Sequence, residues 1–147
     1  MTPLQTYADS SFLLSLNVED GNTKDAGRFI SRHPSLLPFN PLHRLEVSNG
    51  LRLQVWRGQI DPDRRKSALR QIEEDLSEGL LVHVPLPWTE ALRKAEQLSA
   101  AHAEKLGCRS ADTLHVAAAL LAGAKHFLSF DKRQRELAKA AGLEVKP

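Results

Sequence analysis

Short apolar segments alternate with amphipathic helical patterns along the 147-residue chain, and this alternation restricts the fold more than any other feature. Apolar-leaning runs at residues 5–8, 80–84, 125–130 and 143–145 have the length of strands. Strands that alternate with helices favour parallel pairing through right-handed crossovers. A chain of this length corresponds to about one domain. The sequence therefore predicts a single domain over residues 1–147, a three-layer α/β/α sandwich with a short, mostly parallel central sheet.

Capping residues, prolines and glycines mark the ends of the predicted helices. Helices are expected after Ser10 or Ser11 and over residues 23–32, 42–56, 62–78, 88–106 and 132–141. A further helix is expected to be capped by Ser110 and to end at Gly123. In the third of these, Leu45, Leu51 and Val55 recur at helical intervals and predict the apolar face. Between the second and third helices, residues 33–41 hold three of the eight prolines. This segment predicts a loop or a very short extended stretch.

Composition excludes several classes of protein. Apolar residues form 41% and charged residues 26% of the chain, with a net charge of +2, which is ordinary globular usage. No apolar run approaches the roughly 18 residues of a membrane span, and no Lys or Arg precedes Lys24, so we expect neither a membrane segment nor a signal peptide. The single cysteine, Cys108, fits a reducing cytoplasm.

Acidic residues follow two of the predicted strands. Asp9 comes directly after the first strand, and Asp131 directly after the strand at residues 125–130. Open parallel sheets bind ligands at the carboxyl ends of their strands. Ser129 lies two residues before Asp131, so its hydroxyl is predicted on the same side of the extended chain.

Two further acids stand in predicted helices. Asp112 lies in the first turn of its helix, where the helix dipole favours the ionised carboxylate. Glu46 lies near the start of another helix, one turn before Asn49. Four carboxylates with hydroxyl neighbours form an oxygen-only donor set, which selects Mg²⁺ or Mn²⁺ over zinc. Such a site suits hydrolysis of phosphodiesters by metal-activated water.

Each acid also has a purely structural explanation. An Asp after a strand is often a turn or cap residue, which applies to Asp9 and Asp131. Asp112 can serve the helix dipole alone, and Glu46 can be a solvated helix residue. Several carboxylates at one sheet edge, however, repel one another unless a cation holds them. The joint pattern therefore favours a metal site.

Four segments of the chain resemble the motifs of the PIN-domain ribonucleases, especially the VapC-like toxins of type II toxin–antitoxin systems. They are Tyr7–Ser11, Leu42–Asn49, Arg109–Ala117 and Phe127–Asp131. The resemblance implies a PIN-like fold and a cytoplasmic metal-dependent endoribonuclease. It also implies a homodimer and an antitoxin protein that blocks the site. By this resemblance Mg²⁺ or Mn²⁺ is held by Asp9, Glu46, Asp112 and Asp131, with Ser11 and Ser129 assisting.

Alternative functions stay open at this stage. A non-catalytic module would use the acids as caps and its basic residues to bind RNA or a protein. A phosphoryl-transfer domain with Asp9 as nucleophile is a third reading, but no acid follows Asp9 at two residues' distance. His115 and Cys108 are interpreted as packing residues. A partner helix is expected to cover Leu13, Leu14 and the segment 34–41, although the two leucines could equally belong to the core.

Basic residues form two local clusters. Residues 57–70 hold five basic and two acidic side chains, and this cluster is interpreted as a solvated helix face. The second cluster directly follows Asp131 and holds four basic side chains against Glu136. Its position beside the predicted metal site also suits contacts with a phosphate backbone.

Overall fold

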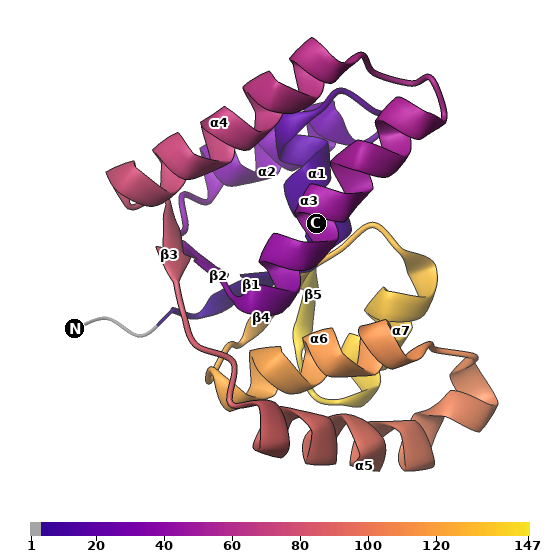
Figure 1. Ribbon diagram of the computed structural model, residues 1–147. Coiled ribbons are helices and arrows are strands. Elements are labelled where there is room, and N and C mark those ends of the chain that lie inside the picture. The colour runs from indigo at the N-terminus through magenta and orange to yellow at the C-terminus, as the bar shows by residue number, and fades with distance from the viewer. Residues whose placement is uncertain (1–3) are drawn as a thin grey trace. The chain divides into compact units, whose positions relative to one another are not determined.

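The computed structural model describes residues 4–147 and divides the chain into two compact units (Figure 1). One unit, called here the terminal unit, combines Met1–Asp9 with Pro85–Pro147. The other, the middle unit, is the continuous segment Ser10–Val84. Each unit contains its own parallel strands, and in both units these strands are connected through helices.

The terminal unit holds a three-stranded parallel sheet in the order β1-β4-β5. Its strands are β1 (Thr6–Ala8), β4 (His126–Leu128) and β5 (Glu144–Lys146). In register, Tyr7 lies opposite Phe127, which lies opposite Val145. Because the strands are parallel, the residues that follow β1 and β4 emerge at the same edge of this sheet.

Three helices complete the terminal unit: α5 (Trp88–Leu106), α6 (Ser110–Leu121) and α7 (Lys132–Ala140). Helices α5 and α6 lie side by side in Figure 1. Gly107, at φ 66°, ends α5 in the left-handed conformation that glycine adopts without steric cost. The buried core of the unit includes Tyr7, Val116, Phe127, Leu128 and Leu137.

The middle unit is mainly helical. Its helices are α1 (Ser10–Asn17), α2 (Thr23–Arg32), α3 (Pro41–Trp56) and α4 (Pro62–Glu78), and the strands β2 (Leu37–Phe39) and β3 (Leu81–His83) pair in parallel. Helix α3 is well capped, because the Asn40 side chain accepts a hydrogen bond from the His43 backbone N–H at 3.0 Å. Phe12, Leu13, Val47, Leu51 and Ile72 are buried in this unit.

The predicted elements are confirmed to within a few residues, and every strand pair is parallel. The strands, however, form two sheets rather than one. The short segment 33–41 contains β2, a three-residue strand. In β3 only Leu81 is buried.

Two expectations about individual side chains were also wrong, and one open alternative is decided. Leu45 is 67% exposed, because the buried face of α3 runs through Leu42, His43, Val47 and Leu51 instead. Leu13 is only 2% exposed, so of the two possibilities left open for it, a place in the core is confirmed. Ser110 is the first residue of α6 and not its cap, because the helix begins one residue earlier than expected and Arg109 occupies the N-cap position.

Candidate functional site

Asp9 lies directly after β1, at the carboxyl end of the terminal unit's sheet. Its backbone N–H donates to the Leu128 carbonyl at 3.1 Å, so the β1–β4 ladder continues through this residue. The residue is only 5% exposed. A buried carboxylate requires polar or charged partners, because removal of its charge from water is costly. Asp9 therefore depends on polar partners within the fold.

Asp131 follows β4 and begins α7. Its Oδ1 accepts from the Gln134 backbone N–H at 2.9 Å, which is an N-cap hydrogen bond. The Asp131 backbone N–H donates to the Ser129 Oγ at 3.0 Å, and Ser129 is fully buried. Ser129 thus acts on Asp131 by fixing the turn between strand and helix. The prediction that Asp131 caps its helix is confirmed, and the capping hydrogen bond uses one of its two carboxylate oxygens.

Asp112 lies in the first turn of α6, as predicted. Its Oδ2 accepts from the Arg109 backbone N–H at 2.8 Å, which fixes the rotation of the carboxylate. Helix α6 leads into β4 through the short turn at residues 122–125, and therefore runs antiparallel to the strands. Its first turn accordingly lies at the end of the unit where Asp9 and Asp131 follow their strands.

The charge of Asp112 also reaches Cys108. Burial raises the pKa of the Cys108 thiol, a backbone hydrogen bond lowers it, and the Asp112 carboxylate raises it further. Nucleophilic attack needs the thiolate, so a raised pKa makes a cysteine less reactive at neutral pH. The interpretation of Cys108 as a packing residue agrees with this environment.

Glu46 belongs to the middle unit, where it projects from α3 and is half-buried. Its Oε1 accepts a hydrogen bond from the Ser10 Oγ at 2.8 Å. Ser10 is buried and directly follows Asp9 in the chain. Ser11, which the resemblance implies as an assisting hydroxyl, is exposed, and its role stays a prediction, whereas Ser10 was not predicted as part of the site. The signal that could have found Ser10 is its position as the first hydroxyl after Asp9.

His115 lies one turn after Asp112 on α6, and it is 4% exposed. Its Nδ1 lies 2.7 Å from the Tyr7 Oη, at hydrogen-bond distance. The interpretation of His115 as a buried residue with a satisfied ring nitrogen is confirmed.

The chemistry of the donor set fits a hard divalent cation. Asp112 and Asp131 each use one oxygen in a helix-capping bond, and neither forms an ion pair within residues 4–147. Carboxylates held in this way present oxygen ligands of the kind that Mg²⁺ and Mn²⁺ prefer. Within the part of the chain that the structure describes, no group of three or more His, Cys, Asp or Glu side chains stands close enough to hold a metal ion.

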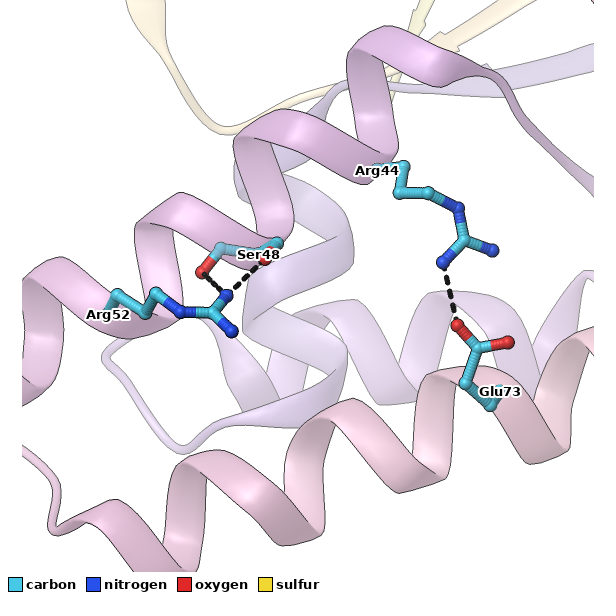
Figure 2. A network of polar contacts seen from close by, with 4 residues as sticks. All are labelled: Arg44, Ser48, Arg52 and Glu73. Carbon is cyan, nitrogen blue, oxygen red and sulfur yellow. Dashed lines mark hydrogen bonds and ion pairs between the residues drawn. The ribbon is translucent and has the colours of Figure 1, made fainter.

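A groove of about 550 Å³ lies between α3 and α4 in the middle unit. Its walls are largely apolar and include Leu45, Val47, Leu69 and Ile72. Figure 2 shows the polar contacts beside it: Arg44 reaches across from α3 to Glu73 of α4 at 2.7 Å, and Arg52 donates to the side chain and carbonyl of Ser48. Glu46 does not line this groove, so the groove is separate from the predicted acids.

The basic residues after Asp131 divide into two kinds. Arg135 is a structural residue, because its guanidinium donates to the Ser129 carbonyl at 2.7 Å and to the Pro147 carbonyl at 3.0 Å. Lys132 and Arg133 are exposed at the start of α7. The Lys132 Nζ lies 3.9 Å from Glu136, a distance at which an exposed ion pair contributes little. Both side chains can therefore contact an external anion.

Two solved structures resemble this chain along almost its whole length. One is the VapC20 toxin of Mycobacterium tuberculosis, which cleaves the sarcin–ricin loop. It is 17% identical with a TM-score of 0.70, and the match covers 97% of this chain and 99% of that one. The other is a protein from Pyrobaculum aerophilum, 19% identical with a TM-score of 0.62, where 97% of this chain and 89% of that chain are covered. No curated protein matches the sequence.

None of the helices within residues 4–147 is long and apolar enough to cross a membrane.

The fold is thus an α/β fold of the kind found in VapC toxins, with short parallel strands and acids after two of them. The PIN-domain family model matches residues 6–140, which include all four predicted acids. The chain belongs to the PIN-domain family. The family and fold class predicted from the sequence motifs are confirmed.

Proposed function

We propose that this protein is a VapC-like endoribonuclease that depends on Mg²⁺ or Mn²⁺, and that both units form one PIN domain. The observation that carries the proposal is the anchoring of Asp9, Asp112 and Asp131 in a chain of this family. Asp9 and Asp131 follow neighbouring parallel strands, and Asp112 is fixed by its hydrogen bond to the Arg109 N–H. The continuous family match over residues 6–140 supports one domain.

In this proposal Asp9, Asp112 and Asp131 hold the cation, and Glu46 is the fourth acid of the site. A bound cation supplies activation of water and stabilisation of negative charge on the phosphate. The Ser10 hydroxyl fixes the rotation of the Glu46 carboxylate through the 2.8 Å hydrogen bond to Oε1. We assign to Glu46 the binding of the attacking water and the acceptance of its proton.

Substrate binding is assigned to the exposed cations at the start of α7. Lys132 and Arg133 directly follow Asp131, so they can bind phosphates that flank the cleaved bond. RNA is the proposed substrate because the chain resembles VapC toxins, and the cytoplasm is the proposed compartment for the same reason.

The proposed protein partners are a second copy of the chain and an antitoxin. Leu45 and Trp56 are 67% and 81% exposed on α3, eleven residues apart and thus on one face of the helix. Large exposed apolar groups of this kind mark interaction surfaces. An antitoxin would silence the enzyme by placing a cationic side chain among the acids, where charge-assisted hydrogen bonds form.

A second candidate function is a non-catalytic PIN module that binds RNA or a protein. It is favoured by the capping bonds of Asp112 and Asp131, which explain both residues without a metal. The absence of a metal-holding group within residues 4–147 agrees with it.

Cleavage of RNA distinguishes the two candidates. Purified protein is incubated with labelled single-stranded RNA in Mg²⁺, in Mn²⁺ and in excess chelator, with Asp112→Asn as the matched control. The proposal predicts cleavage with either cation, loss with chelator and loss in the variant. Equal degradation by wild type and Asp112→Asn would instead indicate a contaminating nuclease and favour the binding module.

Expression in bacterial cells tests the toxin assignment separately. The wild-type chain produced alone should arrest growth, whereas Asp112→Asn should not. Normal growth despite abundant active protein would reject the toxin assignment and leave the nuclease assignment in place.

A further inference from the structure

The hydrogen bond between Tyr7 and His115 joins the strand that precedes Asp9 to the helix that carries Asp112. Tyr7 Oη and His115 Nδ1 are 2.7 Å apart, and the two residues are 1% and 4% exposed. The Tyr7 ring stacks on Phe127 with centroids 5.6 Å apart, and the His115 ring meets it edge-on at 5.8 Å. The pair is therefore buried, and its Tyr7 side is packed against Phe127 of the neighbouring strand.

Each residue of this pair lies two or three positions from one of the acids on the same element. Tyr7 and Asp9 are two residues apart on an extended chain, so they share a face of the sheet. His115 and Asp112 are three residues apart and share a face of α6. Asp9 lies about 6.6 Å further along the strand than Tyr7. Asp112 lies about 4.5 Å from His115 along the helix, toward the same end of the unit.

We infer that the Tyr7–His115 hydrogen bond is a positioning contact that sets the Asp9 and Asp112 carboxylates for a shared divalent cation. This inference rests on the proposed function. This hydrogen bond joins β1 to α6 at residues that lie next to the two acids. It therefore limits how far α6 can slide along β1 and how far the two elements can separate. Loss of the bond would release that constraint and leave both carboxylates in place on their own elements.

The inference is tested by the Mn²⁺ affinity of the full chain, followed by the paramagnetic resonance signal of free Mn²⁺. Tyr7→Phe removes only the hydroxyl and keeps the ring that stacks on Phe127. His115→Phe keeps a buried ring and removes the nitrogen. The matched control is Thr113→Val, which removes a buried hydroxyl whose hydrogen bond, to the Ser110 carbonyl at 2.8 Å, stays within the same helix.

We expect Tyr7→Phe to weaken Mn²⁺ binding about tenfold, at the lower end of what residues behind metal ligands contribute. Thr113→Val should stay within about twofold of the wild type. In the cleavage assay, Tyr7→Phe should lower kcat and leave the KM for RNA unchanged. The double variant Tyr7→Phe with His115→Phe should be no weaker than the weaker single variant, because both remove one contact.

Equal Mn²⁺ affinities for Tyr7→Phe and Thr113→Val would overturn the positioning role. If the His115→Phe protein does not fold, Tyr7→Phe alone decides the question. Failure of the proposed function has a different signature. In that case the wild type binds no Mn²⁺, or Asp9→Asn binds it as tightly as the wild type, and this inference falls with it.

Discussion

The two units of the molecule carry their polar groups in different ways. In the terminal unit, Asp112 and Asp131 are each fixed by a backbone N–H within three residues, and Asp9 continues a strand ladder. In the middle unit, Glu46 is fixed by a side chain 36 residues away. Of the eight large exposed apolar residues within residues 4–147, five belong to the middle unit: Leu36, Leu45, Leu53, Trp56 and Leu80. In the proposed function, this difference assigns the rigid metal ligands to the terminal unit, and the proton acceptor and the surface for partners to the middle unit.

The sharpest test of this division compares Asp9→Asn with Glu46→Gln. Both substitutions replace a carboxylate by an amide of nearly the same shape. Asp9→Asn should lower cleavage by more than about 100-fold and also abolish Mn²⁺ binding, because an amide is a far weaker ligand for a hard cation. Thermal unfolding of the same sample should show that the fold is kept.

Glu46→Gln should lower kcat by roughly 100-fold, the usual range for loss of a general base. Its Mn²⁺ affinity should fall by much less than that of Asp9→Asn. The division between the units breaks down if Glu46→Gln loses Mn²⁺ as completely as Asp9→Asn does.

A surface substitution tests whether the middle unit supplies the surface for partners. Trp56→Ser removes the most exposed large apolar side chain, and it should weaken self-association at least about tenfold, since Trp is a frequent anchor of interfaces. Light scattering after size-exclusion chromatography measures the mass. Leu92→Ser, at an exposed leucine of the terminal unit, is the matched control and should leave the mass unchanged. A wild-type protein that is monomeric at all concentrations contradicts the dimer assignment.

Two helical glycines of the middle unit provide a test of its packing. A Cβ at Gly27 of α2 would meet nothing within 4 Å, whereas a Cβ at Gly50 of α3 would lie 2.8 Å from Leu14 Cδ1. Gly27→Ala should raise the free energy of unfolding by about 0.5–1 kcal/mol. Gly50→Ala should gain less, because Leu14 must move. Denaturant melts measure both values, and a larger gain at Gly50 would show that α1 and α3 are not packed as described.

The smallest expected effect concerns Cys108 in the terminal unit. The Asp112 carboxylate contributes to the raised pKa of this thiol. Asp112→Asn removes that charge and lowers the pKa, so a larger thiolate fraction exists at pH 7.5. Alkylation by iodoacetamide should become about twofold faster. Mn²⁺ added to the wild type should act in the same direction, and an unchanged rate in both cases would indicate that Asp112 is not the ligand.

The sequence was sufficient to predict elements and candidate acids where the local signal is strong. Gly79 and Gly107 end helices in the left-handed conformation, and Asp9 and Asp131 follow strands, because these features depend on neighbouring residues. The sequence did not predict which side of α3 is exposed. Leu45 is apolar and lies at a helical interval from other apolar residues, but His43 takes the buried position.

Contacts between distant residues were also beyond the reach of sequence spacing. The hydrogen bond from Ser10 to Glu46 joins residues 36 positions apart, and the one between Tyr7 and His115 joins residues 108 apart. Such pairs depend on tertiary packing, and periodicity contains no information about them.

The central claim is that Asp9, Asp112 and Asp131 bind a single divalent cation site, and anomalous diffraction from crystals grown with Mn²⁺ tests it most directly. The account predicts an anomalous peak within about 2.0–2.2 Å of an oxygen from at least two of these carboxylates. The same crystals grown from Asp9→Asn protein should lack the peak. Well-ordered crystals in Mn²⁺ with no peak at these residues, and with Asp112 and Asp131 engaged only in their helix caps, would contradict the claim.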